Sequence, residues 1–180
     1  MADSSKKKSI WIAGIALLFT LTFCLGFVFF YAREKEKAEA GTRPASGKPL
    51  PPAELVDAEN QLLPDSALRK GRVVLVFVTA DCDACLRESQ FLRPLVGKRD
   101  DVPFYGVISF GDPNEALRDA KDKFPFKVFY DKNLALAGEL GIKRVPIKLY
   151  LEDGVIKKSW GGATIEESKQ AEFVSWLESL

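Results

Sequence analysis

The fold is decided by residues 72–85, which read RVVLVFVTADCDAC. The run VVLVFV at 73–78 is continuously apolar, which is typical of a strand buried on both faces of a sheet. Cys82 and Cys85 follow this run, and a helical pattern begins at or just after Cys82. Their spacing places both sulfurs on one face of the first helical turn, close enough for a disulfide. This stretch therefore predicts a thiol pair at the junction of a buried strand and a helix.

The two cysteines have different expected roles because they occupy different places on the turn. Cys82 lies nearer the loop, so we expect it to be the exposed nucleophile, with its thiolate stabilised by the helix N-terminus. Cys85 lies one turn in, so we expect it to be the resolving thiol that attacks a mixed disulfide. A purely structural disulfide is the alternative, although a strand-to-helix junction favours exchange chemistry.

The composition limits the chemistry that the chain can perform. Its 180 residues include no histidine and three cysteines. The absence of histidine excludes a histidine base, a histidine metal ligand and a histidine pH switch within the chain. Three sulfurs are too few for a cysteine-only zinc or iron–sulfur site. We therefore expect no metal and no cofactor. The net charge of +1 gives no sign of a basic face, so nucleic acid is not an expected partner.

An apolar segment precedes the domain. Residues 10–31 carry no charge. As a helix they would span about 33 Å, which matches a hydrocarbon core of about 30 Å. We predict a short tail at 1–9 and a transmembrane anchor at 10–32 that contacts the lipid bilayer through residues 10–31, with Cys24 as an apolar membrane residue. A cleaved signal peptide is the alternative, but the stretch is too long for one and no small-residue cleavage site follows.

The orientation of this anchor is not decided by charge. Three lysines precede the apolar segment, at 6–8, and three basic residues follow it, at 33, 35 and 37. A short basic tail before a long folded domain favours a cytoplasmic N-terminus and a domain on the extracytoplasmic, periplasmic side. Residues 33–52 are rich in charge, Pro and Gly, and predict a tether. Residues 53–180 have the size of one domain.

Strand and helix signals alternate through residues 53–180 and predict an α/β domain with a mixed sheet. The expected strands follow a hairpin-like opening at 54–63 and cover 72–79, 104–110, 127–130, 147–151 and 155–160. Expected helices begin near Cys82, after the Asp112-Pro113 cap, and at 133–140. Asp153-Gly154 is typical of the turn in an antiparallel hairpin.

Two further signals lie near the C-terminal end. Thr164-Ile-Glu-Glu167 matches a capping box and predicts a helix that begins there. That helix would bury Phe173, Val174, Leu177 and Leu180. Val145-Pro146 stands directly before the strand IKLYL, where proline is tolerated and where a cis peptide bond can occur.

With these motifs, residues 52–180 resemble the thioredoxin superfamily, and more closely its membrane-tethered TlpA/ResA-like branch of thiol-disulfide oxidoreductases. The similar stretches are LVDAENQLLPDSALRKGRVVLVFVTADCDAC, KFPFKVFYDKN, GIKRVP and the hairpin with its EDG turn. The resemblance implies a thioredoxin-like fold, a mixed central sheet flanked by helices. It also implies that Val145 and Pro146 line the substrate groove and pair with an extended partner segment.

The resemblance assigns a role to Glu88 and marks two departures from the family pattern. Glu88 would accept the proton of Cys85, and a solvated carboxylate on the helix surface is the alternative. Asp81 stands where the family usually has Trp, and Ala84 where it commonly has Pro. Asp81, Asp83 and Ala84 would border the substrate surface. The two aspartates bracket Cys82 with negative charge, which should raise the pKa of its thiol and favour a reductase over a strong oxidant.

These features together predict a membrane-tethered thiol-disulfide oxidoreductase. It would take electrons from an upstream dithiol donor and reduce the disulfides of extracytoplasmic client proteins. One alternative is a redox-inert thioredoxin-fold adaptor. Another is a thiol peroxidase that uses Cys82, because Thr79-Ala-Asp-Cys82 fits a T-x-x-C pattern, although Leu75 stands where peroxiredoxins carry proline.

Overall fold

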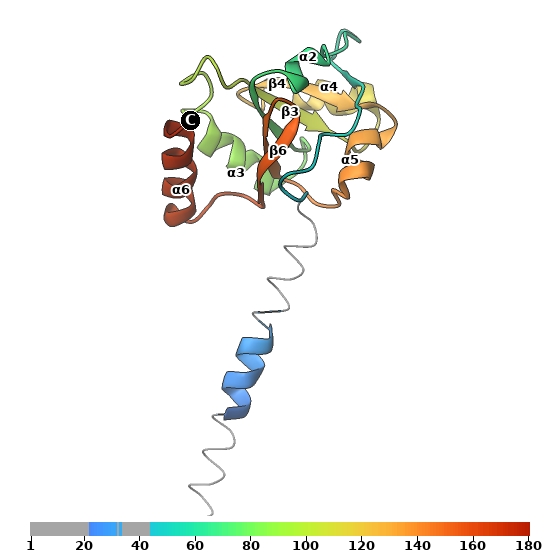
Figure 1. The fold of residues 1–180 in the computed structure, drawn as a ribbon. Coiled ribbons are helices and arrows are strands. Elements are labelled where there is room, and N and C mark those ends of the chain that lie inside the picture. The colour runs from blue at the N-terminus through green and yellow to red at the C-terminus, as the bar shows by residue number, and fades with distance from the viewer. Residues whose placement is uncertain (1–21, 32, 34–43) are drawn as a thin grey trace, which may run out of the picture. The chain divides into compact units, whose positions relative to one another are not determined.

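A six-stranded mixed sheet organises the domain (Figure 1). The computed structural model describes residues 22–31, 33 and 44–180. The strand order is β1-β4-β3-β2-β5-β6, in which β2, β3 and β4 run parallel and the other neighbours pair antiparallel. The strands are β1 (Leu55–Val56), β2 (Arg72–Phe77), β3 (Phe104–Ile108), β4 (Lys127–Asp131), β5 (Ile147–Glu152) and β6 (Val155–Gly161). The predicted α/β domain with a mixed sheet is confirmed.

Helices cover both faces of this sheet. They are α2 (Ser66–Arg69), α3 (Asp83–Leu92), α4 (Pro113–Ala120), α5 (Ala135–Leu140) and α6 (Glu167–Glu178), with a 3₁₀ turn at Lys132–Leu134. Val74 and Val76 of β2 pack in one core with side chains of α3, α4 and α6. Leu75 and Phe77 alternate with them and pack in a second core with side chains of α2 and α5. Figure 1 shows α3 and α6 on one side of the sheet and α5 on the other. The buried strand therefore ends between two helical layers.

Several local signals act as predicted. Asp112 caps α4, and its Oδ1 accepts a hydrogen bond from the backbone N–H of Glu115 at 3.0 Å. Asp153 and Gly154 form the turn between β5 and β6 with φ of 50° and 75°. Glycine suits the second position because of that positive φ, and because a Cβ there would lie 3.3 Å from the Cα of Arg69.

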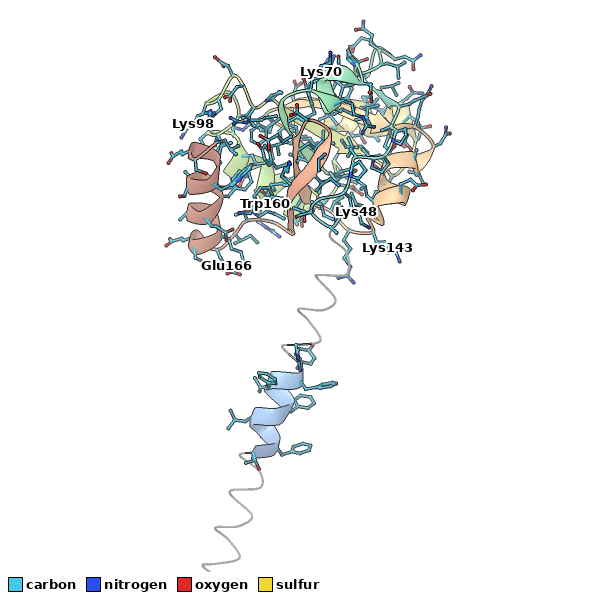
Figure 2. All side chains as sticks on the ribbon, in the orientation of Figure 1. Lys48, Lys70, Lys98, Lys143, Trp160 and Glu166 are labelled. Carbon is cyan, nitrogen blue, oxygen red and sulfur yellow. A yellow bond between two sulfur atoms is a disulfide. The ribbon has the colours of Figure 1, made fainter. Side chains whose placement is uncertain are left out.

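The predicted capping box is wrong. The N-cap of α6 is Glu166, labelled in Figure 2, and its side chain makes no capping hydrogen bond. The helix begins at Glu167, three residues after Thr164, because the side chain and the N–H of Thr164 bind Glu88 instead. The buried face of the helix is closer to the prediction: Phe173 and Leu177 are buried, and the other two side chains pack partly against the same core.

The N-terminal predictions fall mostly on residues outside those described. The residues outside the description are 1–21, 32 and 34–43. They include the predicted tail at 1–9 and most of the predicted anchor. Residues 22–31 are helical and their side chains are exposed (Figure 2). Cys24 is among them and carries a free thiol. Within the described ranges, no helix combines the length and the apolarity needed to cross a bilayer.

Part of the predicted tether packs with the domain. The backbone N–H groups of Gly47 and Leu50 donate to Ile156 O and Gly154 O, each at 2.7 Å. The side chain of Leu50 is buried in the second core, and Arg69 binds the carbonyl oxygen of Leu50. Residues 44–52 therefore add backbone pairing beside β6 and belong to the domain structurally.

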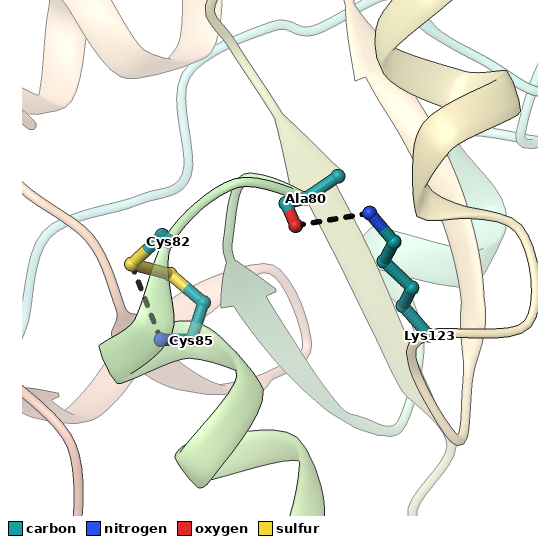
Figure 3. Close-up of a disulfide and its surroundings, with 4 residues drawn as sticks. All are labelled: Ala80, Cys82, Cys85 and Lys123. Carbon is teal, nitrogen blue, oxygen red and sulfur yellow. Dashed lines mark hydrogen bonds between the residues drawn. A yellow bond between two sulfur atoms is a disulfide. The ribbon is translucent and has the colours of Figure 1, made fainter.

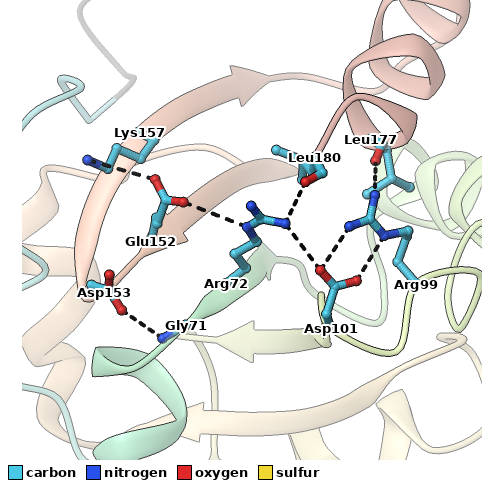
Figure 4. Close-up of polar contacts among 9 residues, drawn as sticks. All are labelled: Gly71, Arg72, Arg99, Asp101, Glu152, Asp153, Lys157, Leu177 and Leu180. Atoms are coloured by element: carbon cyan, nitrogen blue, oxygen red, sulfur yellow. Dashed lines mark hydrogen bonds and ion pairs between the residues drawn. The ribbon is translucent and has the colours of Figure 1, made fainter.

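A cluster of charged side chains lies around Arg72, the first residue of β2 (Figure 4). Cys82 follows the other end of this strand. Asp101 accepts two hydrogen bonds from Arg99, both at 2.8 Å, and one from Arg72 at 3.2 Å. Arg72 also donates to the carbonyl oxygen of Leu180 at 2.6 Å. The hydrogen bonds from Arg99, with the positive charges of Arg99 and Arg72, lower the pKa of Asp101 to about 2.

This lowered pKa predicts how the contribution of Asp101 to stability depends on pH. The folded-state pKa lies below the unfolded value, so the stabilisation is present above about pH 4 and disappears as the pH falls toward 2. Asp101→Asn should lower the urea midpoint at pH 6. The difference from the unsubstituted chain should shrink between pH 4 and pH 2. A difference in urea midpoint that stays constant down to pH 2 would contradict the lowered pKa of Asp101. Asp100→Asn on the same loop is the control.

Candidate redox site

Cys82 and Cys85 form a disulfide at the start of α3, with their Cα atoms 5.2 Å apart. Cys82 is the N-cap residue of the helix, and its Sγ accepts the backbone N–H of Cys85 at 3.2 Å (Figure 3). A sulfur at this position faces the unpaired N–H groups of the first turn, which stabilise negative charge. The strand-to-helix junction thus places Cys82 where its thiolate is favoured.

The two sulfurs differ in access. Cys82 is half-buried, whereas Cys85 is fully buried in the core that lies under α3. A partner thiol or disulfide approaching from solvent therefore reaches Cys82 first. This order of access is the one required by an attacking Cys82 and a resolving Cys85.

The peptide bond between Val145 and Pro146 is cis and lies directly before β5. Val145 lines a pocket of about 510 Å³ together with Ala80 and Asp81, which precede Cys82. The structure therefore brings the proline loop and the loop before the cysteines to one pocket. Asp83 is not among the residues that line it.

The other substrate-surface candidates lie on the first turn of α3. Asp83 is exposed, and Ala84 is half-buried. Pro146 is buried directly before β5, whereas Val145 is half-buried and is the more accessible of the two.

Lys123 also belongs to this region, although it was not predicted from the sequence. Its Nζ donates to the carbonyl oxygen of Ala80 at 3.2 Å, as Figure 3 shows. Its own carbonyl oxygen accepts the hydroxyl of Ser89 on α3 at 2.8 Å. Lys123 thus links the loop before Cys82 to the cysteine helix. No local motif marks it, because both contacts depend on the tertiary fold.

Glu88 is buried, so the alternative reading as a solvated surface carboxylate is wrong. Its Oε1 lies 2.6 Å from Lys148 Nζ and accepts the hydroxyl of Thr164 at 3.0 Å. Its Oε2 accepts the backbone N–H of Thr164 at 2.5 Å. Neither charged side chain of the pair is exposed to solvent. Glu88 is therefore the acidic member of a fully buried ion pair one helical turn beyond Cys85.

Lys148 and Thr164 were also missed by the sequence analysis. A signal for Lys148 was available, because it interrupts the apolar strand IKLYL, and a lysine inside a buried strand needs a partner. Thr164 carried a misleading local signal for a helix cap. In the described part of the chain, no group of three or more acidic or cysteine side chains is arranged to hold a metal.

Comparison with known proteins agrees with this geometry. The Redoxin family model matches residues 45–172, which contain both cysteines and the cis proline. The chain belongs to the Redoxin family. No curated protein matches its sequence.

Solved structures show the same fold as this Redoxin-family chain. A secreted Mycobacterium tuberculosis disulfide oxidoreductase homologous to E. coli DsbE is 17% identical, with a TM-score of 0.60 over 73% of this chain and 97% of that one. The exposed lipoprotein thioredoxin Etrx1 of Streptococcus pneumoniae is 19% identical, with a TM-score of 0.58 over 71% and 98%. MTB DsbF is 17% identical, with a TM-score of 0.60 over 72% and 95%. The thioredoxin-like fold of thiol-disulfide oxidoreductases is confirmed.

Proposed function

We propose that this Redoxin-family chain reduces disulfides of client proteins by dithiol exchange through Cys82 and Cys85. The observation that carries the proposal is the pairing of a half-buried sulfur at the helix N-cap with a fully buried sulfur one turn further on. The cis Val145-Pro146 loop, which shares a pocket with the loop before Cys82, supports it by offering a backbone edge to an extended client segment.

The reaction begins with both cysteines reduced. The Cys82 thiolate attacks one sulfur of the client disulfide, which forms a mixed disulfide and releases the first client thiolate. Cys85 then loses its proton to Glu88 and attacks Cys82 Sγ. The Cys82–Cys85 disulfide forms, the second client thiolate leaves, and the client has gained two electrons. An upstream dithiol donor restores the pair by the same exchange in the opposite direction.

We also propose that the domain acts at a membrane. A single membrane anchor through residues 10–31 would hold the domain at the bilayer on the extracytoplasmic side, where disulfides persist. Support comes from the uncharged composition of this segment and from the exposed phenylalanines on the helical residues 22–31.

Electron transfer to a disulfide tests the proposal. The reduced full chain, in detergent micelles, is mixed with insulin as a protein disulfide and with oxidised glutathione as a small one. We expect about one disulfide reduced per chain, because the pair carries two electrons. The Cys82→Ser/Cys85→Ser variant is the control. If neither substrate gains thiols beyond this control, the redox-inert adaptor becomes the better interpretation. Rapid oxidation of the reduced chain by hydrogen peroxide, with no disulfide substrate present, would favour the thiol peroxidase.

The direction of the reaction rests on the negative charges beside Cys82. Asp81 and Asp83 are both exposed, so each effect is modest and screened by salt. Asp81→Asn/Asp83→Asn should raise the iodoacetamide alkylation rate of Cys82 at pH 6 by about two- to fivefold, because exposed charges contribute up to about 1 kcal/mol. The gain should fall in 1 M salt. An unchanged rate beside the Asp100→Asn control would contradict the charge argument.

A further inference from the structure

The buried pair of Glu88 and Lys148 joins three parts of the domain. Glu88 lies on α3, Lys148 on β5, and Thr164 on the segment between β6 and α6. Thr164 Oγ1 lies 2.9 Å from Lys148 Nζ as well as 3.0 Å from Glu88 Oε1, so it contacts both charges. Lys148 Nζ also lies 5.6 Å from the ring centroid of Phe173 on α6. The ammonium group is thus held from several sides.

This pair lies beside the cysteine site. Cys85 and Glu88 are three residues apart on α3, which places them on the same helix face, and both are buried. Lys148 follows Pro146 by two residues on β5. The ion pair therefore connects the helix that carries the cysteines to the strand that carries the cis proline.

The hydrogen bonds of Glu88 fit an ionised carboxylate. It accepts hydrogen bonds from Lys148 Nζ, Thr164 Oγ1 and Thr164 N, and a carboxylate is an acceptor only. A lone buried charge is very costly, whereas a pair with satisfied hydrogen bonds is tolerated. Lys148 therefore allows a carboxylate to exist at this depth.

The other buried carboxylates in the described part of the chain are engaged away from α3. Asp131 accepts from the Ser109 hydroxyl and from the backbone N–H groups of the first turn of α5. Asp57 pairs with Lys127 at 2.6 Å. Among the buried carboxylates described, Glu88 is thus the one that shares a helix with Cys85.

We propose that Lys148 is a positioning residue for the resolving step, in which it acts as a fixed counter-ion while the proton of Cys85 moves. This inference rests on the proposed function. The S–H bond of Cys85 breaks, the proton goes to Glu88, and Lys148 keeps its own proton. The thiol, carboxylate and ammonium become a thiolate, a carboxylic acid and an ammonium, so the net charge of the buried group stays at zero. The Cys85 thiolate then attacks Cys82 Sγ, and the bond between Cys82 and the client breaks.

Loss of Lys148 would remove the positive charge that keeps the buried group neutral. The buried group would carry a charge of −1, so Glu88 would take up a proton from solvent and could no longer accept one from Cys85. Deprotonation of Cys85 would then depend on hydroxide. The attack by Cys82 on the client precedes this transfer and does not require it.

The two steps are separated with 5,5′-dithiobis(2-nitrobenzoate) and the reduced full chain in micelles, with Cys24→Ser in every variant so that this free thiol releases no nitrothiobenzoate. Attack by Cys82 releases one nitrothiobenzoate, and attack by Cys85 on the resulting mixed disulfide releases a second. In Lys148→Met we expect the second phase to slow at least tenfold at pH 7, with the first phase unchanged within twofold. Lys148→Arg should keep part of the second phase. Lys158→Met is the control, because Lys158 pairs with Glu172 at the surface and lies over Trp160 and Trp176.

The pH profile distinguishes this role from a merely structural one. The second-phase rate of the unsubstituted chain should rise less than tenfold per pH unit between pH 6 and 8. In Lys148→Met and Glu88→Gln it should rise about tenfold per unit, as a hydroxide-dependent step does. A Lys148→Met profile parallel to that of the unsubstituted chain, or an equal slowing of both phases, would overturn the inference.

A second comparison covers the case in which Lys148→Met does not fold. Glu88→Gln/Lys148→Met removes both charges, and its second phase should equal that of Glu88→Gln alone, because Lys148 acts through Glu88. A double variant at least fivefold slower than Glu88→Gln would overturn the inference. If the unsubstituted chain itself releases no second nitrothiobenzoate, the proposed function fails, and the inference fails with it.

Discussion

Cys85→Ser is expected to abolish turnover and to leave the client attached to the protein through Cys82. Attack by the half-buried Cys82 remains possible, but the buried resolving thiol that would release the product is missing. Disulfide reduction with a dithiol donor in excess should fall at least a thousandfold. Mass spectrometry of the alkylated full chain should detect a mixed disulfide at Cys82.

The matched control is Cys82→Ser, which keeps the buried thiol and removes the accessible one. It should lose turnover equally but trap no client. Trapped species in Cys82→Ser, or their absence from Cys85→Ser, would contradict the assignment of the two roles. Cys24→Ser in both backgrounds removes the remaining thiol as a source of adducts.

The second large effect concerns stability. Lys148→Ala should lower the free energy of unfolding by about 3–5 kcal/mol, because Glu88 loses its buried partner and has to take up a proton to stay buried. Glu88→Leu/Lys148→Met removes both charges and should cost much less, since an apolar pair of similar size is often neutral at a buried site. Urea unfolding followed by far-ultraviolet circular dichroism measures both values.

A surface ion pair on the same sheet is the control for the buried pair. Lys158 of β6 pairs with Glu172 at 3.2 Å, and both side chains are partly exposed. Its replacement by Ala should cost at most about 1 kcal/mol. If Lys148→Ala costs no more than Lys158→Ala, the buried pair does not have the energetic role that its burial implies.

The parts of the fold that were predicted correctly depend on local signals. The apolar run at 73–78 is typical of a strand covered on both faces, and it became the centre of the sheet. Asp112 and Asp153-Gly154 specify a helix cap and a tight turn through their own backbone preferences. Cys82 and Cys85 were placed correctly because the junction of that strand with a helix is itself a local feature.

The parts that were missed depend on contacts between distant segments. Glu88 and Lys148 are 60 residues apart, so nothing near either residue in the sequence predicts that they pair. Thr164 fits a local capping pattern, but the buried carboxylate competes for its hydroxyl and N–H and prevails. Leu50 lies in a segment rich in proline and glycine, and only the tertiary structure shows that its side chain enters the core.

The reduction potential of the Cys82–Cys85 pair decides whether the protein works as a reductase. It is measured by equilibrating the full chain in dithiothreitol and glutathione redox buffers and counting free thiols. We expect a reversible two-electron transition nearer to about −270 mV, as in thioredoxin, than to about −120 mV, as in the strong oxidant DsbA. A midpoint near the second value would contradict the reductase assignment. The absence of any reversible transition would contradict dithiol exchange altogether.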